Sequence, residues 1–200
     1  MIRIKTLEVA GIGPAVHAMR NPYDSWEESE THQGHIGEAD RVLSDKLSKA
    51  GTEHCKHLRL CMVWAEIEAP LYWWKEFDTY RMGVEKVSCS TMHTITKKKF
   101  TPELFSGEVD HAVINWLEVV RGFYLAAETQ EQKQVYWRRI IENLPSGFIQ
   151  RRTVMMSYAA LREICRQRKG HKLSEWHDFR KWAFGLPEGW MIGESEGDEK

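Results

Sequence analysis

Alternating apolar and polar residues mark the first predicted strand. Residues 2–5 alternate isoleucine with arginine and lysine, and the alternation continues loosely to Val9, where Gly-Ile-Gly-Pro at 11–14 breaks it. We therefore expect a strand followed by a turn. A similar alternation over 58–64 indicates a second strand or an extended entry into a helix.

Helical spacing of apolar residues dominates the rest of the chain. Gly51 is well placed to end the first predicted helix, and Pro70 and Gly83 suit the start and the end of the second. The predicted helices are 36–47, 70–82, 109–127, 135–144, 153–167 and 174–184. The polar segments 20–35 and 97–99 are predicted loops, and 88–93 is a run of small polar residues.

The chain has no internal repeat and no recognisable linker, so we expect one domain over residues 1–192. Residues 193–200 are acidic and contain glycine, which predicts a flexible tail. With 200 residues, 42% of them hydrophobic and 28% charged, the chain is long enough to bury a substantial core. This excludes a disordered peptide.

The charges are nearly balanced, with 28 Lys and Arg against 29 Asp and Glu and a net charge of -1. Nucleic acid and anionic membranes are therefore not expected partners, and any anion needs a local cluster of cations. The chain lacks an apolar run that could span a membrane, and its N-terminus lacks a signal-peptide core, so a cytoplasmic location is expected. The 4 cysteines show no framework spacing, which favours reduced thiols.

One predicted helix carries a hydroxyl and a guanidinium on its apolar stripe. Ser157, Leu161, Ile164 and Arg168 follow helical spacing, with Ser157 and Arg168 about 16 Å apart along the axis. An arginine on a buried face needs an anion, which suggests an extended anionic ligand. Alternatively, Arg168 lies at the end of the helix and interacts with its carbonyl groups and dipole.

Arg81, Arg151 and Arg152 could converge on one phosphate, because the planar guanidinium donates paired hydrogen bonds to phosphate oxygens. Each of them could equally be a surface residue. Other chemistries find weaker support. The glycines at 11–13 lack the third glycine of a dinucleotide motif, the His and Cys residues of 54–61 match no zinc spacing, and Cys89 has no recognisable partner base.

Several of these residues together resemble the flavin-dependent thymidylate synthases, the ThyX family, over most of residues 50–185. The segments 69–81 and 88–93 are similar to the family signature R-H-R-x-x-S-x-N-E-x-S-x-R, in which Ser90 matches the serine. The C-terminal half resembles the family in Leu144-Pro145, Arg151, Ser157 with Leu161, Arg168, His171 and Trp176.

The chain also departs from the family pattern. Thr79-Tyr80-Arg81 stands where the signature has Arg-His-Arg, so only the second of its two arginines is kept, as Arg81. Met92 replaces the final arginine of the signature. Further departures are Glu76 for Gln, Ser157 for Asn and Ala159 for Arg.

The resemblance implies an α+β ThyX-like fold with helices packed on a mixed or antiparallel sheet, and a homotetramer with shared active sites. It implies reductive methylation of dUMP to dTMP, using FAD, with NADPH and methylenetetrahydrofolate as co-substrates. It gives catalytic roles to Arg168, at the pyrimidine edge, and to Ser90. It assigns nucleotide binding to Glu76, Arg81, Ser90, Arg151 and Arg168, flavin contacts to Ser157 and His171, and no metal.

Three alternatives remain open from the sequence. The same chemistry could modify another pyrimidine nucleotide at C5, or the chain could be a catalytically silent relative that binds nucleotide or flavin. A structural or single-strand-binding module is the third, in which Trp73 and Trp74 stack on bases.

Overall fold

The structure, a computed structural model, describes residues 2–32 and 35–193. The strands are β1 (Arg3–Ala10), β2 (Met62–Pro70), β3 (Val84–Ser88) and β4 (Ile149–Ser157). The α-helices are α1 (Ile12–Met19), α2 (Glu38–Lys49), α3 (Leu71–Phe77), α4 (Thr91–Thr94), α5 (His111–Ala126), α6 (Gln130–Glu142), α7 (Tyr158–Gln167) and α8 (Ser174–Phe184). Short 3-10 turns are η1 (Asn21–Tyr23), η2 (Trp26–Glu28), η3 (Cys55–Arg59), η4 (Pro102–Leu104) and η5 (Gly189–Met191). Apart from Gly193, the tail predicted at 193–200 lies outside the described residues.

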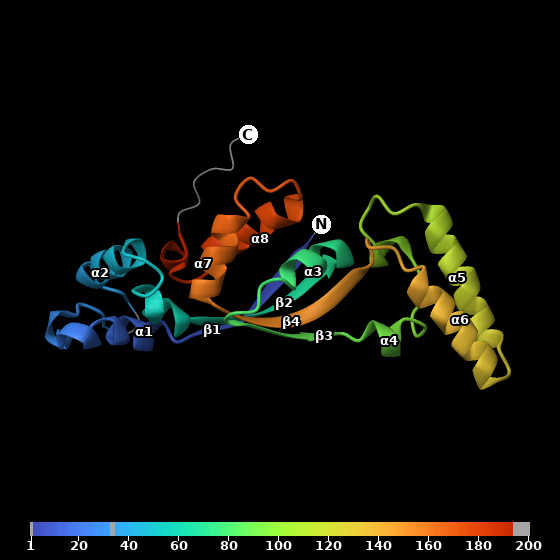
Figure 1. Ribbon diagram of the computed structural model, residues 1–200, viewed down its shortest axis with the longest axis horizontal. Helices are drawn as coiled ribbons and strands as arrows, with labels where there is room; N and C mark the ends of the chain where they lie inside the picture. The colour runs from blue at the N-terminus through green and yellow to red at the C-terminus, as the bar shows by residue number, and fades with distance from the viewer. Residues whose placement is uncertain (1, 33–34, 194–200) are drawn as a thin grey trace. The chain divides into compact units, whose positions relative to one another are not determined.

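The four strands form one antiparallel sheet in the order β1-β2-β4-β3 (Figure 1). Backbone hydrogen bonds fix the register where β4 ends. The amide of Ser157 donates to the carbonyl of Gly83, and the amide of Tyr158 donates to the carbonyl of Cys61, each over 2.9 Å. An antiparallel sheet combined with helices confirms the predicted α+β class.

The chain divides into two compact units. Unit 1 contains residues 1–3, 68–79 and 87–152, and unit 2 contains residues 4–67, 80–86 and 153–200. The single domain expected over residues 1–192 stays a prediction. Within the described part of the chain, no helix is both long and apolar enough to cross a membrane.

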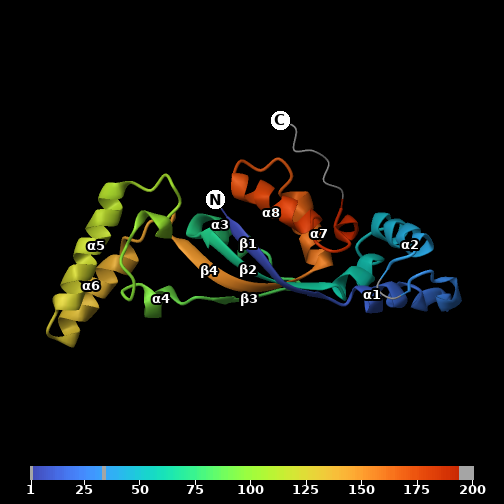
Figure 2. The same cartoon turned by 180° about the vertical axis from the view of Figure 1, so that it is seen from behind.

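Unit 1 is built around the helices α5 and α6, which lie side by side (Figure 2). Each helix has a capped start: the side chain of Asp110 accepts from the amide of Ala112, and Thr129 and Gln132 form a capping box. Both helices contribute to one buried apolar cluster, which contains Ile95, Phe100, Phe105, Ile114, Leu117, Val120 and Ile140.

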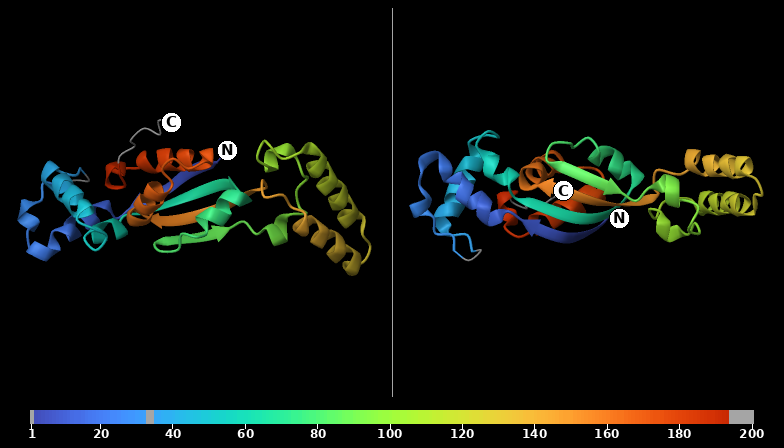
Figure 3. Two further views of the ribbon diagram at one scale, coloured as in Figure 1. Left: turned by 45° about the horizontal axis from the view of Figure 1, so that its top comes forward. Right: turned by 90° about the horizontal axis from the view of Figure 1, so that it is seen from below.

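In unit 2, η3 contacts α1, α2 and α7, and α7 packs against α8 (Figure 3). A buried ion pair fastens the segment after α1 to α2: Arg20 Nε donates to Asp40 Oδ1 over 2.7 Å, and both side chains are almost fully buried. Asp40 Oδ2 also accepts from the hydroxyls of Ser29 and Thr31. Three residues of the predicted loop over 20–35, Arg20, Ser29 and Thr31, are therefore anchored to the Asp40 carboxylate.

The first predicted strand and the helices at 36–47, 109–127 and 174–184 are confirmed, within a few residues, by β1, α2, α5 and α8. The turn predicted at 11–14 is instead the start of α1. Gly11 has φ 86° and lies so close to the Leu60 carbonyl that a Cβ would be 2.1 Å from its oxygen. Pro14 is tolerated because the first helical turn needs no amide donor there.

Three predicted helices are wrong in part. The helix predicted over 135–144 is α6, which already begins at Gln130 and ends at Glu142. Pro70 is the last residue of β2, and α3 ends at Phe77, well before the predicted end at Met82. The helix predicted over 153–167 begins only at Tyr158, because Val154 and Met156 alternate with more exposed neighbours and belong to β4. The strands β3 and β4 were not predicted, because their period-two alternation of apolar residues is brief and mixed with long polar side chains.

Candidate functional site

Arg168 lies at the centre of a cluster of aromatic and polar side chains in unit 2. Its amide ends α7 by donating to the carbonyl of Ile164 over 2.9 Å. Its side chain donates from Nε to the hydroxyl of Tyr80 over 2.8 Å and lies over two rings, 4.5 Å from the centroid of Trp176 and 5.4 Å from that of Tyr80. The guanidinium is therefore held by a hydrogen bond and two cation–π contacts while remaining partly exposed.

His171 completes this cluster. Its Nε2 lies 3.1 Å from Arg168 Nη1, and its Nδ1 accepts from the amide of Leu173 over 3.1 Å. A neutral imidazole accepts at only one ring nitrogen, so these two contacts compete for a single acceptor position. The tautomer of His171 therefore decides whether the ring supports the guanidinium of Arg168.

Ser157 is the N-cap of α7 and has an extended backbone, so it precedes the helix and does not belong to the helical stripe predicted from the sequence. Its Oγ accepts from the amide of Ala160 over 3.2 Å, and the residue is only 4% exposed. Gly83, with φ 67°, lies against it, since a Cβ there would be 2.5 Å from Ser157 Oγ. Arg168 is the C-cap, so these two predicted site residues stand at opposite ends of α7.

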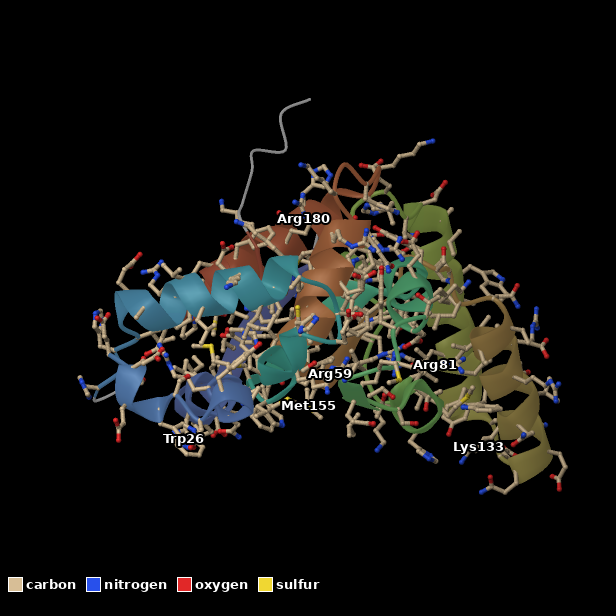
Figure 4. All side chains as sticks on the ribbon, turned by 60° about the vertical axis from the view of Figure 1, so that its left-hand side comes forward. Trp26, Arg59, Arg81, Lys133, Met155 and Arg180 are labelled. Atoms are coloured by element: carbon tan, nitrogen blue, oxygen red, sulfur yellow. The ribbon has the colours of Figure 1, made fainter. Side chains whose placement is uncertain are left out.

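Arg81 is exposed and follows Tyr80 in unit 2 (Figure 4). The predicted helix would have placed Glu76 and Arg81 about 140° apart around one axis. Because α3 ends at Phe77, that constraint disappears: Glu76 lies in the last turn of α3, and Arg81 lies outside any helix.

Arg151 in unit 1 already has a carboxylate partner. Its Nε donates to Glu68 Oε1 over 2.8 Å, and Arg3 Nε donates to Glu68 Oε2 over 2.7 Å. Burial alone would raise the pKa of the Glu68 carboxyl, but Arg151 and Arg3 bring it below its ordinary value. An incoming phosphate at Arg151 must therefore compete with Glu68 or share the guanidinium with it.

Ser90 lies in a loop that β4 holds in place. Gln150 Nε2 donates to the carbonyl of Cys89 and to the hydroxyl of Thr91, each over 3.1 Å. Ser90 lies between these two anchored residues and is partly exposed, and its carbonyl accepts from the hydroxyl of Thr94 over 2.8 Å. The loop thus presents the Ser90 side chain from a fixed backbone.

Arg152, the third arginine of the predicted phosphate cluster, serves the fold of unit 1. Its Nη1 donates to Asp78 over 2.7 Å, and its guanidinium lies 4.2 Å from the ring centroid of Trp74. The indole of Trp74 is 1% exposed and that of Trp73 is 0% exposed. Stacking of bases on these two rings, the third alternative from the sequence, is therefore wrong.

The cysteines are free thiols, as predicted. Burial raises the pKa of Cys61 to about 12 and that of Cys165 to about 12, so both are inert, whereas Cys89 is exposed. The thiol of Cys55 faces the carbonyls of Leu47, Ser48 and Gly51. Among the residues that the structure describes, His, Cys, Asp and Glu form no group that could hold a metal ion.

Two residues that orient predicted site arginines, Tyr80 and Glu68, were not predicted as site residues. Tyr80 was read only as a departure from a histidine, although its place directly before Arg81 could have suggested a shared site. Glu68 was not singled out, although it alternates with apolar residues on β2 and faces the basic residues of β1 and β4. Cross-strand pairs of opposite charge are the available signal for such a partner.

No protein-family model matches this chain, and no curated protein matches it. Solved structures do. Thymidylate Synthase X (ThyX) from Helicobacter pylori with FAD and dUMP is similar with a TM-score of 0.71 and 16% identity, over 96% of this chain and 96% of that chain. A second structure, flavin dependent thymidylate synthase ThyX from Helicobacter pylori complexed with FAD and dUMP, gives a TM-score of 0.69 and 16% identity over 94% and 96% of the two chains.

The similarity covers nearly the whole length of both chains, so it applies to the order of strands and helices as a whole and not to a shared fragment. This chain therefore has the fold of the flavin-dependent thymidylate synthases, as its sequence resemblance predicts.

Proposed function

We propose that this protein is a flavin-dependent thymidylate synthase-like enzyme that methylates dUMP reductively to dTMP. The observation that carries this proposal is the fixed guanidinium of Arg168, at the position that the sequence resemblance assigns to nucleotide binding. The fold, shared with proteins whose structures contain FAD and dUMP, supports it. The proposed assembly is a homotetramer with shared active sites.

Arg168 is the proposed catalytic group at the pyrimidine. Negative charge develops on a pyrimidine carbonyl when C5 is activated, and a guanidinium oriented beforehand stabilises that charge without reorganising. The hydroxyl of Tyr80 and the ring of Trp176 supply this orientation. Arg168 therefore binds the nucleotide edge and favours loss of the C5 proton.

The phosphate of the nucleotide is assigned to Ser90 and Arg81, with Arg151 as a helper. Ser90 donates a hydroxyl hydrogen bond, and the arginines supply charge. Glu76 contacts the nucleotide near its sugar or phosphate. Its carboxylate can accept a hydrogen bond from a sugar hydroxyl, whereas it repels the negative charge of a phosphate.

The residues assigned to the flavin fit it in part. His171 is partly exposed and able to contact a bound ring, whereas Ser157 is buried and its oxygen caps α7. His171 is therefore the residue of this chain that we assign to the flavin. When bound, FAD supplies the redox chemistry between NADPH and the one-carbon unit from methylenetetrahydrofolate.

Release of tritium from C5-labelled dUMP, with added FAD, tests the proposal without requiring the correct folate. The wild-type protein should release tritium, and Arg168→Ala should lower the rate by about a hundredfold if a charged contact worth about 3 kcal/mol is lost. Arg166→Ala is the matched control, because Arg166 is exposed on the same helix and pairs with Glu163. Equal rates for wild type and Arg168→Ala would refute the proposed role of Arg168.

A catalytically silent relative that binds nucleotide or flavin is the second candidate. The pairing of Arg151 with Glu68 favours it, because a phosphate-binding arginine is already neutralised. Such a protein binds dUMP or takes up FAD, seen by its flavin absorption, without releasing tritium. The same C5 chemistry on another pyrimidine nucleotide instead gives tritium release from that nucleotide and not from dUMP.

A further inference from the structure

An open cavity of about 660 Å³ lies at the surface of unit 2, lined by mostly exposed residues of α2, by Arg162 of α7 and by residues of η5 and the segment after it. Its volume is in the range of small-molecule sites, roughly 300–1,000 Å³. None of the residues assigned above to the nucleotide or the flavin lines it. It is therefore a candidate for a second site.

The charge of this cavity is not balanced. Asp45 pairs with Lys49 over 2.7 Å on the surface of α2, so the charge of this carboxylate is balanced by Lys49 and not by an arginine. Arg41 and Arg162 also line the cavity, and neither forms an ion pair with a carboxylate in the described part of the chain. Glu38 is the other acidic lining residue. Within the described residues, the guanidinium groups of Arg41 and Arg162 thus border one cavity without an ion-pair partner.

Both guanidinium groups are nevertheless held in place. That of Arg41 lies 4.8 Å from the ring centroid of Trp190, and Arg162 Nη2 donates to the carbonyl of Ser48 over 3.1 Å. Contacts that order an arginine before binding reduce the entropy lost when a ligand arrives. The remaining N–H donors suit the paired oxygens of a phosphate or carboxylate.

The rest of the lining is partly apolar. Val42, Trp190 and Met191 contribute side chains that suit a hydrocarbon or aromatic body better than a bare inorganic ion. A ligand that matches the cavity therefore combines one oxyanion with an apolar body.

We propose that this cavity binds a small organic oxyanion, with its phosphate or carboxylate held by Arg41 and Arg162 and its apolar body against Val42, Trp190 and Met191. The site is separate from the Arg168 cluster, and its existence does not depend on the proposed synthase activity. Phosphate and carboxylate share the chemistry that the two arginines recognise.

Calorimetric titration of the full chain with phenyl phosphate and with benzoate, at about 0.15 M salt to screen diffuse surface charge, tests the site. We expect saturable binding of at least one probe at one site, and the tighter probe identifies the head group. Arg41→Gln together with Arg162→Gln should weaken binding by at least about tenfold. Arg168→Ala should leave it unchanged, which separates this site from the proposed nucleotide site.

Arg59→Gln is the matched control, because Arg59 is exposed on η3 and does not line the cavity (Figure 4). Arg162 also donates to the carbonyl of Ser48, so its replacement could unfold the double variant. In that case Arg41→Gln alone is used, and it should still weaken binding severalfold. Equal affinities of wild type and Arg41→Gln, an equal loss in Arg59→Gln, or absence of saturable binding by both probes would overturn the proposal.

Discussion

The hydrogen bond between Tyr80 and Arg168 should be measurable by itself. Tyr80→Phe removes the hydroxyl that accepts from Arg168 Nε over 2.8 Å but keeps the ring, whose centroid is 5.4 Å from the guanidinium. A hydrogen bond to a charged group contributes about 1.5–3 kcal/mol, and partial exposure brings this one below that range. The expected coupling between the two side chains is therefore about 1 kcal/mol.

A double-mutant cycle of urea unfolding measures this coupling. Tyr80→Phe and Arg168→Ala are made singly and together, and the double variant should be about 1 kcal/mol more stable than the sum of the single losses predicts. Tyr23→Phe is the control partner, because Tyr23 is 86% exposed and should show no coupling.

The same variant tests the positioning role in the proposed reaction. If the hydroxyl orients Arg168, Tyr80→Phe should weaken dUMP binding about threefold to tenfold, because part of the ordering of the guanidinium then occurs only on binding. Tyr80→Ala should weaken it further by removing the cation–π contact. Additive stabilities in the cycle, together with dUMP affinity unchanged in Tyr80→Phe, would refute the reasoning.

Three further predictions concern substitutions of Asp40, Ser157 and Glu68. Asp40→Asn removes the buried carboxylate that pairs with Arg20 and leaves Arg20 only the exposed Glu28 as an ion-pair partner, so it should cost about 3 kcal/mol in urea unfolding at pH 7. Burial would raise the pKa of Asp40, but its hydrogen bonds lower it overall, so its stabilisation is complete above pH about 4 and is lost as the pH falls toward the lowered folded pKa; the variant should lack this dependence. Ser157→Ala removes the cap of α7 and should cost about 1 kcal/mol in the same assay. Glu68→Gln should tighten dUMP binding if Arg151 contacts its phosphate, as titration calorimetry would measure.

Each of these predictions has a matched control. Asp45→Asn alters an exposed ion pair on α2 and should change stability by less than about 1 kcal/mol. Ser174→Ala changes an exposed serine at the start of α8 that makes no cap, and Glu85→Gln changes an exposed carboxylate on β3. A loss of stability in Asp40→Asn no larger than in Asp45→Asn, or weaker dUMP binding in Glu68→Gln, would contradict the corresponding argument.

The sequence determined the elements whose signal is local. The helix α8 begins and ends as its apolar spacing predicts, and α5 and α2 follow within a few residues. Their periodic apolar faces and end residues act within a few turns of one helix, so they can be read without knowing the neighbours. The resemblance of the C-terminal half to the ThyX family predicted the fold for a related reason, because it rests on the spacing of a few residues and not on overall identity.

Only the tertiary structure decided to which strand or helix some residues belong and which distant side chains form contacts. In the sequence, Ser157 fits a position inside a helix as well as a position at its start. Only the pairing of β4 with β2 and β3 makes it the N-cap of α7. Tyr80 and Arg168, 88 residues apart, and Glu68 and Arg151, 83 residues apart, meet only because the chain folds. Contacts between side chains that are distant in sequence depend on how the whole chain folds. No local pattern of hydrophobic residues specifies them.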